Sequence, residues 1–300
     1  SVVDKIVNEG ITPPRKVLVN KSHTNKKRVV YVYPQEENNV LKMIVYLLIR
    51  KYDEWFEPNL YSFRVNNGVR KVIPYLINGK RTDRKYVYKT DISSYFNSIN
   101  VPLVLGQLEF ILKDDIEIYD LIKGMLENPC VYDNDELVMD RNKGVMAGNP
   151  IAAFLANVYL TELDRKFYKS GTIYARYSDD IIIFSNSAEQ REKDIALIKD
   201  ELAVKGLLVN LEKEKLFNPG ERWEFLGFSY CNGIVDISRN SFEKLKGKMR
   251  RKAHALIRWM HKNKVDNIRA AKAFIRIFNK KLFDNIESEM AWSRLYFPMI

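Results

Sequence analysis

Two adjacent aspartates between apolar runs limit most strongly what this chain can be. Asp179 and Asp180 follow the run 172–177 and precede the run 181–184, and both runs consist mostly of residues that favour strands. The sequence therefore predicts a tight hairpin with residues 178–180 at its turn. Two ionised carboxylates among apolar neighbours are costly unless a cation neutralises them. The pair is explained either by a metal site or by an exposed turn that contains aspartates.

A third carboxylate, Asp91, ends another predicted strand. Residues 85–92 alternate between apolar and polar side chains, as in a half-buried strand. Neighbouring strands can bring Asp91 beside Asp179 and Asp180 at one edge of a sheet. Three carboxylates with no histidine or cysteine nearby form an all-oxygen ligand set that suits Mg²⁺ or Mn²⁺. Two such ions can activate an attacking hydroxyl and stabilise the leaving oxygen in phosphoryl transfer, which favours a polymerase or a nuclease.

Other local patterns predict helices between the strands, and so an α+β fold. Residues 28–33 are a β-favouring run, residues 40–50 carry apolar side chains at helical spacing, and a further helix is expected over 188–205. Asn149 and Pro150 are a good helix start, because asparagine caps free amides and proline suits the first helical position. From there, one helical face is expected to carry Ile151, Phe154, Leu155, Val158 and Leu163.

Positive charge is concentrated near the C-terminus. Residues 239–281 contain 15 lysines and arginines but only two acids, which gives +13 and leaves −2 for the rest of the chain. Two apolar helical stripes flank a polar break at 261–264, so a basic helical bundle is predicted after a boundary near residue 237. This bundle is either a solvated surface or, as we favour, a surface for a phosphate backbone. Aromatic residues within it include Phe242, Trp259, Phe274 and Phe278.

Composition excludes several other classes. A chain of 300 residues with 46% hydrophobic content can bury a full core. The two cysteines, Cys130 and Cys231, lack the spacing of a disulfide framework or a zinc site. No apolar run is long enough to span a bilayer, and the first residues lack the layout of a signal peptide. We therefore expect a soluble protein of the reducing cytoplasm with no membrane partner; the sequence predicts no particular oligomeric state.

The order of the motifs resembles reverse transcriptases of the bacterial group II intron-like lineage, which includes retron, diversity-generating and phage-defence enzymes. The resemblance runs from about residue 26 to 252, and six matches in order are far more specific than any single one. The matching motifs are Lys27-Arg28 with the strand after it, Leu60-Tyr61-Ser62-Phe63-Arg64, Asp91-Ile92-Ser93-Ser94-Tyr95-Phe96, Tyr177-Ser178-Asp179-Asp180, Gly206-Leu207 through Asn210 to Lys213, and Phe225-Leu226-Gly227-Phe228.

This resemblance implies a right-hand polymerase. Its parts are fingers over 1–84, an antiparallel-sheet palm over 85–237 with a fingers-side insertion at about 105–142, and a basic helical thumb over 238–300. The implied activity is RNA-directed addition of dNTPs to a 3′-hydroxyl, in phage defence or a related system. The implied partners are an RNA template, such as a dedicated non-coding RNA, a DNA product strand and dNTPs.

The resemblance also implies a metal centre. Asp91, Asp179 and Asp180 are the expected catalytic ligands of two Mg²⁺ ions, with Mn²⁺ as a substitute, and Ile92 joins them as a metal ligand. Lys213 matches a proton donor to pyrophosphate, although a surface lysine among charged neighbours is an equally good explanation.

Further residues are implied in nucleotide binding. Lys27 and Arg28 match a segment that grips the incoming triphosphate. Phe96, five positions after Asp91, matches a steric gate against a ribose 2′-hydroxyl; a role in the core is the alternative. Ala147 and Gly148 fall where the family contacts template and nucleotide.

One motif departs from the family pattern. When the chain is aligned on Leu155-Ala156-Asn157, Met146-Ala147-Gly148-Asn149 stands where group II-type enzymes have Pro-Gln-Gly-Gly. We expect a chain with this variant motif to belong to the defence-associated members of the lineage. Gly144 and Gly148 are expected to permit close approach of nucleic acid, because no phosphate-loop pattern is present.

Three alternatives remain at this stage. An RNA-dependent RNA polymerase shares the palm but usually has a second acid where this chain has Phe96. An untemplated DNA polymerase of the abortive-infection type would use the same carboxylates. A nucleic-acid-binding protein with a dead site is disfavoured because all three aspartates are present.

Overall fold

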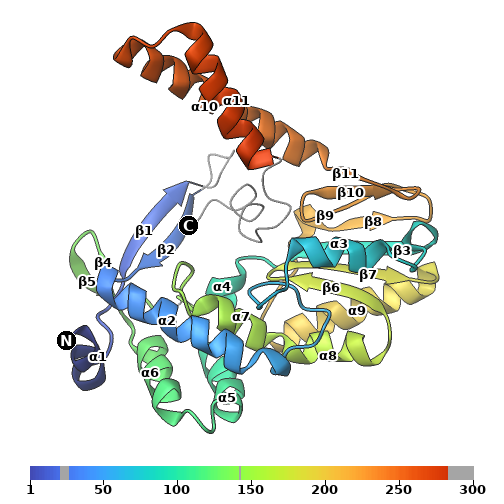
Figure 1. The fold of residues 1–300 in the computed structure, drawn as a ribbon. Helices are drawn as coiled ribbons and strands as arrows, with labels where there is room; N and C mark the ends of the chain where they lie inside the picture. Colours follow the sequence, from blue (N-terminus) through green and yellow to red (C-terminus); the bar gives the residue numbers. More distant parts are fainter. Residues whose placement is uncertain (21–26, 142, 283–300) are drawn as a thin grey trace. The chain divides into compact units, whose positions relative to one another are not determined.

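The computed structural model describes residues 1–20, 27–141 and 143–282 (Figure 1). The chain forms two compact units. The first comprises Ser1–Leu226 and Tyr230–Val235, and the second comprises Gly227–Ser229 and the residues from Asp236 onward. Strands and helices are mixed throughout the first unit, which confirms the expected α+β class.

The N-terminal part of the first unit is built around a four-stranded sheet of order β2-β1-β4-β5. Helix α1 (Val2–Glu9) precedes β1 (Arg15–Asn20) and β2 (Lys27–Val32), and the edge hairpin is β4 (Cys130–Asp133) with β5 (Glu136–Met139). The strand expected over 28–33 is thus present.

Helix α2 (Gln35–Lys51) begins five residues earlier than its apolar spacing predicts. Pro34 stands at the N-cap, and Glu36 and Glu37 lie in the first turn. Acidic side chains there interact favourably with the free amides and the helix dipole. Polar residues therefore start this helix, and an apolar period does not detect them.

The helix expected from Asn149 is wrong in its start and its length. The Asn149 side chain accepts from the amide of Ile151 at 3.0 Å and so caps a turn. Helix α7 (Ala152–Tyr159) starts after that turn, and Leu160 leaves helical geometry before α8 (Thr161–Lys169). The Thr161 hydroxyl bonds back to the carbonyl of Asn157 at 3.0 Å, a contact that bends helices. Leu163 therefore belongs to a different helix.

A second sheet of order β6-β7-β3-β8 carries the aspartates. Its strands are β6 (Ile173–Tyr177), β7 (Asp180–Ser185), β3 (Tyr86–Asp91) and β8 (Lys215–Phe217), and neighbouring strands are antiparallel. The expected hairpin and the strand over 85–92 are both confirmed. Helix α9 (Ala188–Val204), predicted over 188–205, packs with α8 against this sheet (Figure 1).

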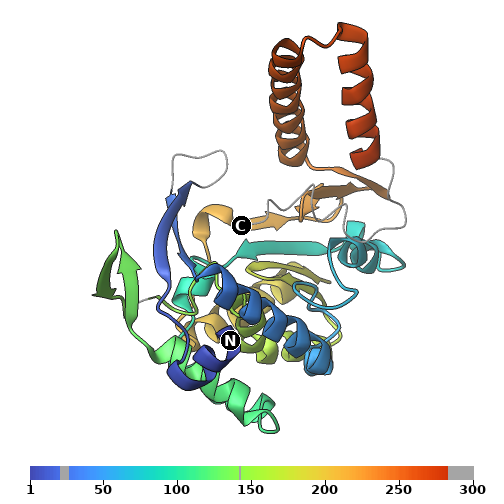
Figure 2. The ribbon, with the colours of Figure 1, turned by 60° about the vertical axis from the view of Figure 1, so that its left-hand side comes forward.

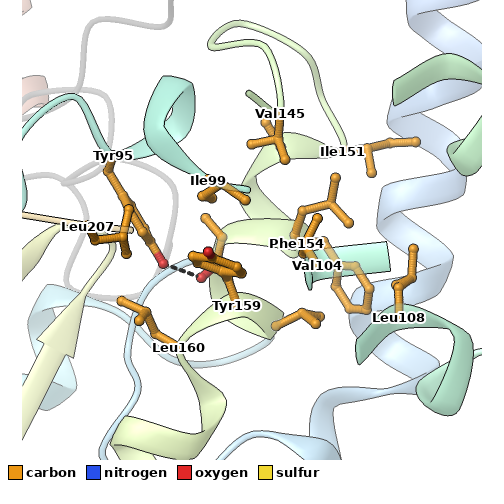
Figure 3. Packing of buried hydrophobic residues seen from close by; sticks show 14 of the residues in the cluster. Tyr95, Ile99, Val104, Leu108, Val145, Ile151, Phe154, Tyr159, Leu160 and Leu207 are labelled. Atoms are coloured by element: carbon orange, nitrogen blue, oxygen red, sulfur yellow. Dashed lines mark hydrogen bonds between the residues drawn. The ribbon is translucent and has the colours of Figure 1, made fainter. Parts of the chain in front are cut away.

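The hydrophobic core of the first unit lies among helices between the two sheets. These are α4 (Tyr95–Ser98), α5 (Val101–Ile111), α6 (Ile116–Glu127) and α7, while α3 (Val69–Ile77) packs beside β6. Figure 3 shows Tyr95, Ile99, Phe154 and Tyr159 packed in this core. The Tyr95 hydroxyl donates to the carbonyl of Ala156 at 2.6 Å. The core thus anchors the segment that follows Asp91.

Three short strands come next in the chain: β9 (Trp223–Phe225), β10 (Phe228–Cys231) and β11 (Ile234–Ile237). The second unit then forms a helical hairpin of α10 (Arg239–Asn263) and α11 (Asn267–Leu282) (Figure 2). Lys264 ends α10 in the left-handed conformation, within the predicted polar break. The side chain of Phe278 lies outside the described residues.

No helix within the described residues combines the length and the apolar character that crossing a bilayer requires.

Candidate active site

The register between β3 and β7 brings the aspartates together. Asp91, the last residue of β3, pairs directly with Asp180, the first residue of β7. Residues that pair directly in an antiparallel sheet project from the same face, so the two carboxylates are neighbours. The carbonyl of Asp179 accepts from the amide of Ile92 at 3.1 Å, which ties the turn to the end of β3.

The turn before Asp179 has a strained residue. Ser178 has a φ of 59°, a left-handed conformation that is uncommon outside glycine. Its amide donates to the Ser62 hydroxyl at 2.8 Å, and its carbonyl accepts from the Arg176 guanidinium at 3.2 Å. These contacts hold both backbone polar groups of Ser178 and therefore fix the direction in which the chain continues to Asp179.

Arg176 belongs to an ion pair that is fully buried. Its guanidinium bonds both oxygens of Asp164, at 2.8 and 2.6 Å, and both side chains are 0% exposed. The Tyr174 hydroxyl also donates to Asp164 at 2.9 Å. A buried pair is tolerated when further hydrogen bonds satisfy its remaining groups, as these do. The pair thus forms a rigid support beneath the hairpin.

The 60–64 motif lies beside this support. The amide of Tyr61 donates to the carbonyl of Arg176, and the amide of Arg176 donates to that of Asn59, both at 3.0 Å. The Ser62 hydroxyl donates to Asn157 at 3.1 Å, and the Asn157 amide group returns a bond to the carbonyl of Ser62 at 2.9 Å. This segment therefore extends the edge of the second sheet beside the turn that contains Ser178.

The sequence interpretation assigned no role to Ser62, Asn157, Asp164 or Arg176. Two of them fell inside motifs used only for alignment. The other two gave no signal, because an arginine in a strand and an aspartate in a helix usually face solvent.

Electrostatics at the site reflect crowded negative charge. Burial, together with the negative charges of Asp180 and Asp91, raises the pKa of Asp179 to about 7. Burial also raises the pKa of Asp180. Lys213, at the end of the short 3₁₀ helix η3 (Leu211–Lys213), places its Nζ 2.5 Å from Asp91 Oδ2. Although burial opposes it, this contact raises the pKa of Lys213.

With the side chains in their present conformations, no group of three or more His, Cys, Asp or Glu residues in the described ranges is arranged to hold a metal ion. Asp91 is engaged by Lys213 instead. The side chain of Ile92 is apolar and buried, so only its backbone carbonyl can serve as a ligand.

The expected nucleotide-binding residues lie on other elements. Lys27 and Arg28 are exposed on β2, and among the described residues neither forms an ion pair with the three aspartates. Phe96 follows Tyr95 in α4 and is half-buried, with its ring centroid 5.8 Å from that of Tyr95. The carbonyl of Ala147 accepts from the amide of Tyr31 at 2.8 Å. Ala147 and Gly148 thus lie against β2.

The two glycines lie close against the protein's own backbone. A Cβ on Gly144 would meet the carbonyl oxygen of Phe96 at 2.4 Å, and one on Gly148 would meet the carbonyl oxygen of Tyr31 at 3.0 Å. Both residues also have positive φ, 52° and 98°. The protein's own backbone therefore occupies the room that these glycines leave.

Comparison with known proteins identifies the family. The model of the reverse transcriptase (RNA-dependent DNA polymerase) family matches residues 19–230, which include all three aspartates. The chain belongs to this family.

Individual proteins that resemble this chain are also polymerases of this kind by name or by fold. Retron Ec86 reverse transcriptase from Escherichia coli is 22% identical over 168 residues, which are 55% of this chain and 48% of that protein. Apo telomerase from Candida tropicalis has a TM-score of 0.60 at 14% identity, covering 78% of this chain and 49% of that one. Telomerase from Candida albicans in complex with a TWJ fragment of telomeric RNA has a TM-score of 0.58 at 12% identity, covering 82% and 51%.

The chain thus spans about half the length of these relatives. The structural likeness confirms the expected right-hand polymerase fold, and the retron relative agrees with the bacterial lineage inferred from the motifs.

Proposed function

We propose that this chain is an RNA-directed DNA polymerase that adds dNTPs to a 3′-hydroxyl with two Mg²⁺ ions held by Asp91, Asp179 and Asp180. The observation that carries the proposal is the direct pairing of Asp91 with Asp180, beside Asp179. Membership of the reverse transcriptase family supports DNA rather than RNA as the product.

The three aspartates are chemically suitable ligands for Mg²⁺. Three carboxylates are hard oxygen ligands. Burial and the charges of Asp180 and Asp91 together raise the pKa of Asp179, and a divalent cation would offset both effects. Ions bound there would activate the 3′-hydroxyl and stabilise the leaving oxygen; Mn²⁺ has the same preference for oxygen ligands. The carbonyl of Ile92 is the remaining proposed ligand.

Lys213 is proposed to serve the leaving group. Its ammonium forms an ion pair with Asp91 at 2.5 Å. If Asp91 held a cation, that ammonium would be free beside the carboxylates and could donate a proton to pyrophosphate.

Phe96 is proposed as the gate against a 2′-hydroxyl. Support comes from its half-burial, because the core holds the ring while part of it stays accessible. Lys27 and Arg28 are proposed to hold the triphosphate, and Ala147 and Gly148 to contact nucleotide or template from the loop that β2 supports.

The proposed assembly follows the family. Fingers over 1–84, a palm over 85–237 with an insertion at about 105–142, and a thumb over 238–300 are the proposed parts. An RNA template, a DNA product and dNTPs are the proposed partners, in a reducing cytoplasm and a phage-defence or related system. Two free cysteines within the described residues and the retron relative support this setting.

A primer-extension assay tests the proposal. Purified chain is given an RNA template annealed to a DNA primer, Mg²⁺, and either dNTPs or NTPs, and the product is sequenced. We expect a complementary DNA product from dNTPs, none in EDTA, and none from Asp179→Asn. Asp120→Asn, at an exposed position on α6, is the matched control and should stay active. A product unrelated to the template would point to untemplated synthesis, and preference for NTPs would overturn the proposal.

A further inference from the structure

The face of the second sheet that carries the aspartates also carries two lysines. Lys89 lies two residues before Asp91 on β3, so strand alternation puts both side chains on one face. Lys89 pairs directly with Lys215 of β8, which therefore projects from the same face. Strands β7, β3 and β8 lie side by side in this order (Figure 1). The face thus has carboxylates at one end and two ammonium groups beside them.

Lys89 lies at the border between the buried part of this face and the part that carries the aspartates. Val87, two residues before Lys89 on β3, pairs with Phe184, and both side chains are buried. The Phe184 ring packs edge-on against Trp223, with 5.2 Å between the ring centroids. The Lys89 Nζ lies 6.0 Å from the centroid of the Phe225 ring, and the residue is half-buried. The Lys89 ammonium thus lies between the aromatic cluster and the carboxylate end of the face.

The two lysines have no close counter-ion. Like charges directly opposite on neighbouring strands are destabilising. Within the described part of the chain, neither ammonium has a carboxylate oxygen within the 4.0 Å of an ion pair, whereas Lys213 contacts Asp91 at 2.5 Å. Asp180 and Glu224 attract Lys89 only from farther away. An anion bound between the lysines would relieve this repulsion.

We propose that Lys89 and Lys215 bind one backbone phosphate of the primer strand, one or two nucleotides back from its 3′-hydroxyl. The inference rests on the proposed function, which puts that hydroxyl at the aspartates. Two strand residues separate Lys89 from Asp91 by about 6.7 Å, and phosphates along one strand recur about every 3.4 Å of helix axis. The pair therefore acts as a positioning clamp that sets where the primer end lies.

Duplex binding without catalysis tests the clamp. The probe is a dye-labelled DNA primer with a dideoxy 3′ end, annealed to an RNA template, and affinity is measured by anisotropy at several salt concentrations. Lys89→Gln and Lys215→Gln should each weaken binding roughly 10-fold near 0.1 M salt and lower the salt slope by about one. Lys113→Gln, at an exposed site between α5 and α6, is the matched control. Equal losses in all three variants would overturn the proposal.

The contacted phosphate can be located chemically. A single uncharged methylphosphonate linkage is moved stepwise along the primer and then along the template. When the methylphosphonate replaces the phosphate that the clamp contacts, the affinity of the wild type should fall about 10-fold, whereas the affinity of Lys89→Gln should not change. We expect this position one or two linkages from the primer 3′ end. If no primer position shows this behaviour, or only a template position does, the clamp is wrong.

The KM for dNTP and the Tm distinguish the clamp from two other roles of these lysines. A lysine that held the triphosphate tail would raise the KM for dNTP and leave duplex affinity unchanged, which would overturn the clamp. A lysine that only stabilised the sheet would lower Tm when replaced, whereas relief of repulsion should raise the Tm of the free protein by about 1–3 °C. Because binding needs no turnover, loss of the clamp in an active enzyme and absence of polymerase activity in the wild type are distinguishable results.

Discussion

The guanidinium of Arg176 donates to the carbonyl oxygen of Ser178 at 3.2 Å, immediately before the aspartate pair. The same guanidinium is held by both oxygens of the buried Asp164. The direction of the turn before Asp179 is therefore set by a fully buried ion pair. This arrangement lets a strained residue, Ser178, keep one conformation.

Breaking this ion pair should unfold or misplace the turn. Arg176→Ala leaves Asp164 buried without its partner, so we expect a loss of about 3–5 kcal/mol in the free energy of unfolding, measured in urea. The double variant Arg176→Met with Asp164→Leu removes both charges and should recover most of that stability. Polymerase activity should stay low in the double variant because the bond to Ser178 is still missing. Full activity there would show that the pair acts on stability alone.

Neutralising Asp179 should stabilise the metal-free protein while it abolishes activity. Its pKa is raised to about 7 in the folded state, above its value of about 3.9 in an unfolded chain. The ionised carboxylate therefore penalises folding, and the penalty is absent below about pH 4 and complete above about pH 7. In EDTA, Asp179→Asn should melt roughly 2–4 °C higher than wild type at pH 8 and equally at pH 4. A lower Tm at pH 8 would contradict this account.

Much of this site follows from strand periodicity. Alternation over 85–92 and the apolar runs around Asp179 predict two strands, and acids at strand ends are brought together by pairing. The support behind the turn could not be predicted, since Arg176 meets Asp164 only after α8 folds onto β6. The break at Leu160 was missed for a similar reason, because apolar residues continue across it. Local patterns predict the elements, whereas tertiary contacts decide where they bend.

Replacing Phe96 tests the sugar gate against a packing role. Phe96→Val should raise rNTP use relative to dNTP, because a smaller side chain leaves room for the 2′-hydroxyl. Half-burial makes some destabilisation inevitable, below the 3–5 kcal/mol that is typical for a fully buried phenylalanine. Leu108→Ala, in the core on α5, is the matched control for destabilisation without a change in sugar choice. An unchanged dNTP-to-rNTP ratio would assign Phe96 to packing.

The basic helices are expected to bind phosphate backbone. Replacing Lys248, Arg251 and Lys252 of α10 by Gln should weaken template-primer binding with little sequence preference and lower the salt slope by up to about three. The same change at three exposed positions of the first unit, Lys113, Lys169 and Lys193, is the control. If both triple variants retain the wild-type slope, the helices form only a solvated surface.

Gly144 should be far less tolerant of a side chain than other glycines in the same conformation. Gly144 and Gly171 have φ of 52° and 70°, so alanine at either position costs about 1–2 kcal/mol in backbone strain. A Cβ at Gly171 meets nothing within 4 Å, whereas at Gly144 it would meet the carbonyl oxygen of Phe96 at 2.4 Å. Gly144→Ala should therefore lose about 1–3 kcal/mol more in urea unfolding. The displaced backbone carries Phe96, so the Gly144→Ala enzyme should also discriminate less against rNTPs. Gly171→Ala should keep the wild-type ratio of dNTP to rNTP use. Equal losses in both variants would mean that the backbone near Phe96 yields easily, and that the close approach does not position the ring.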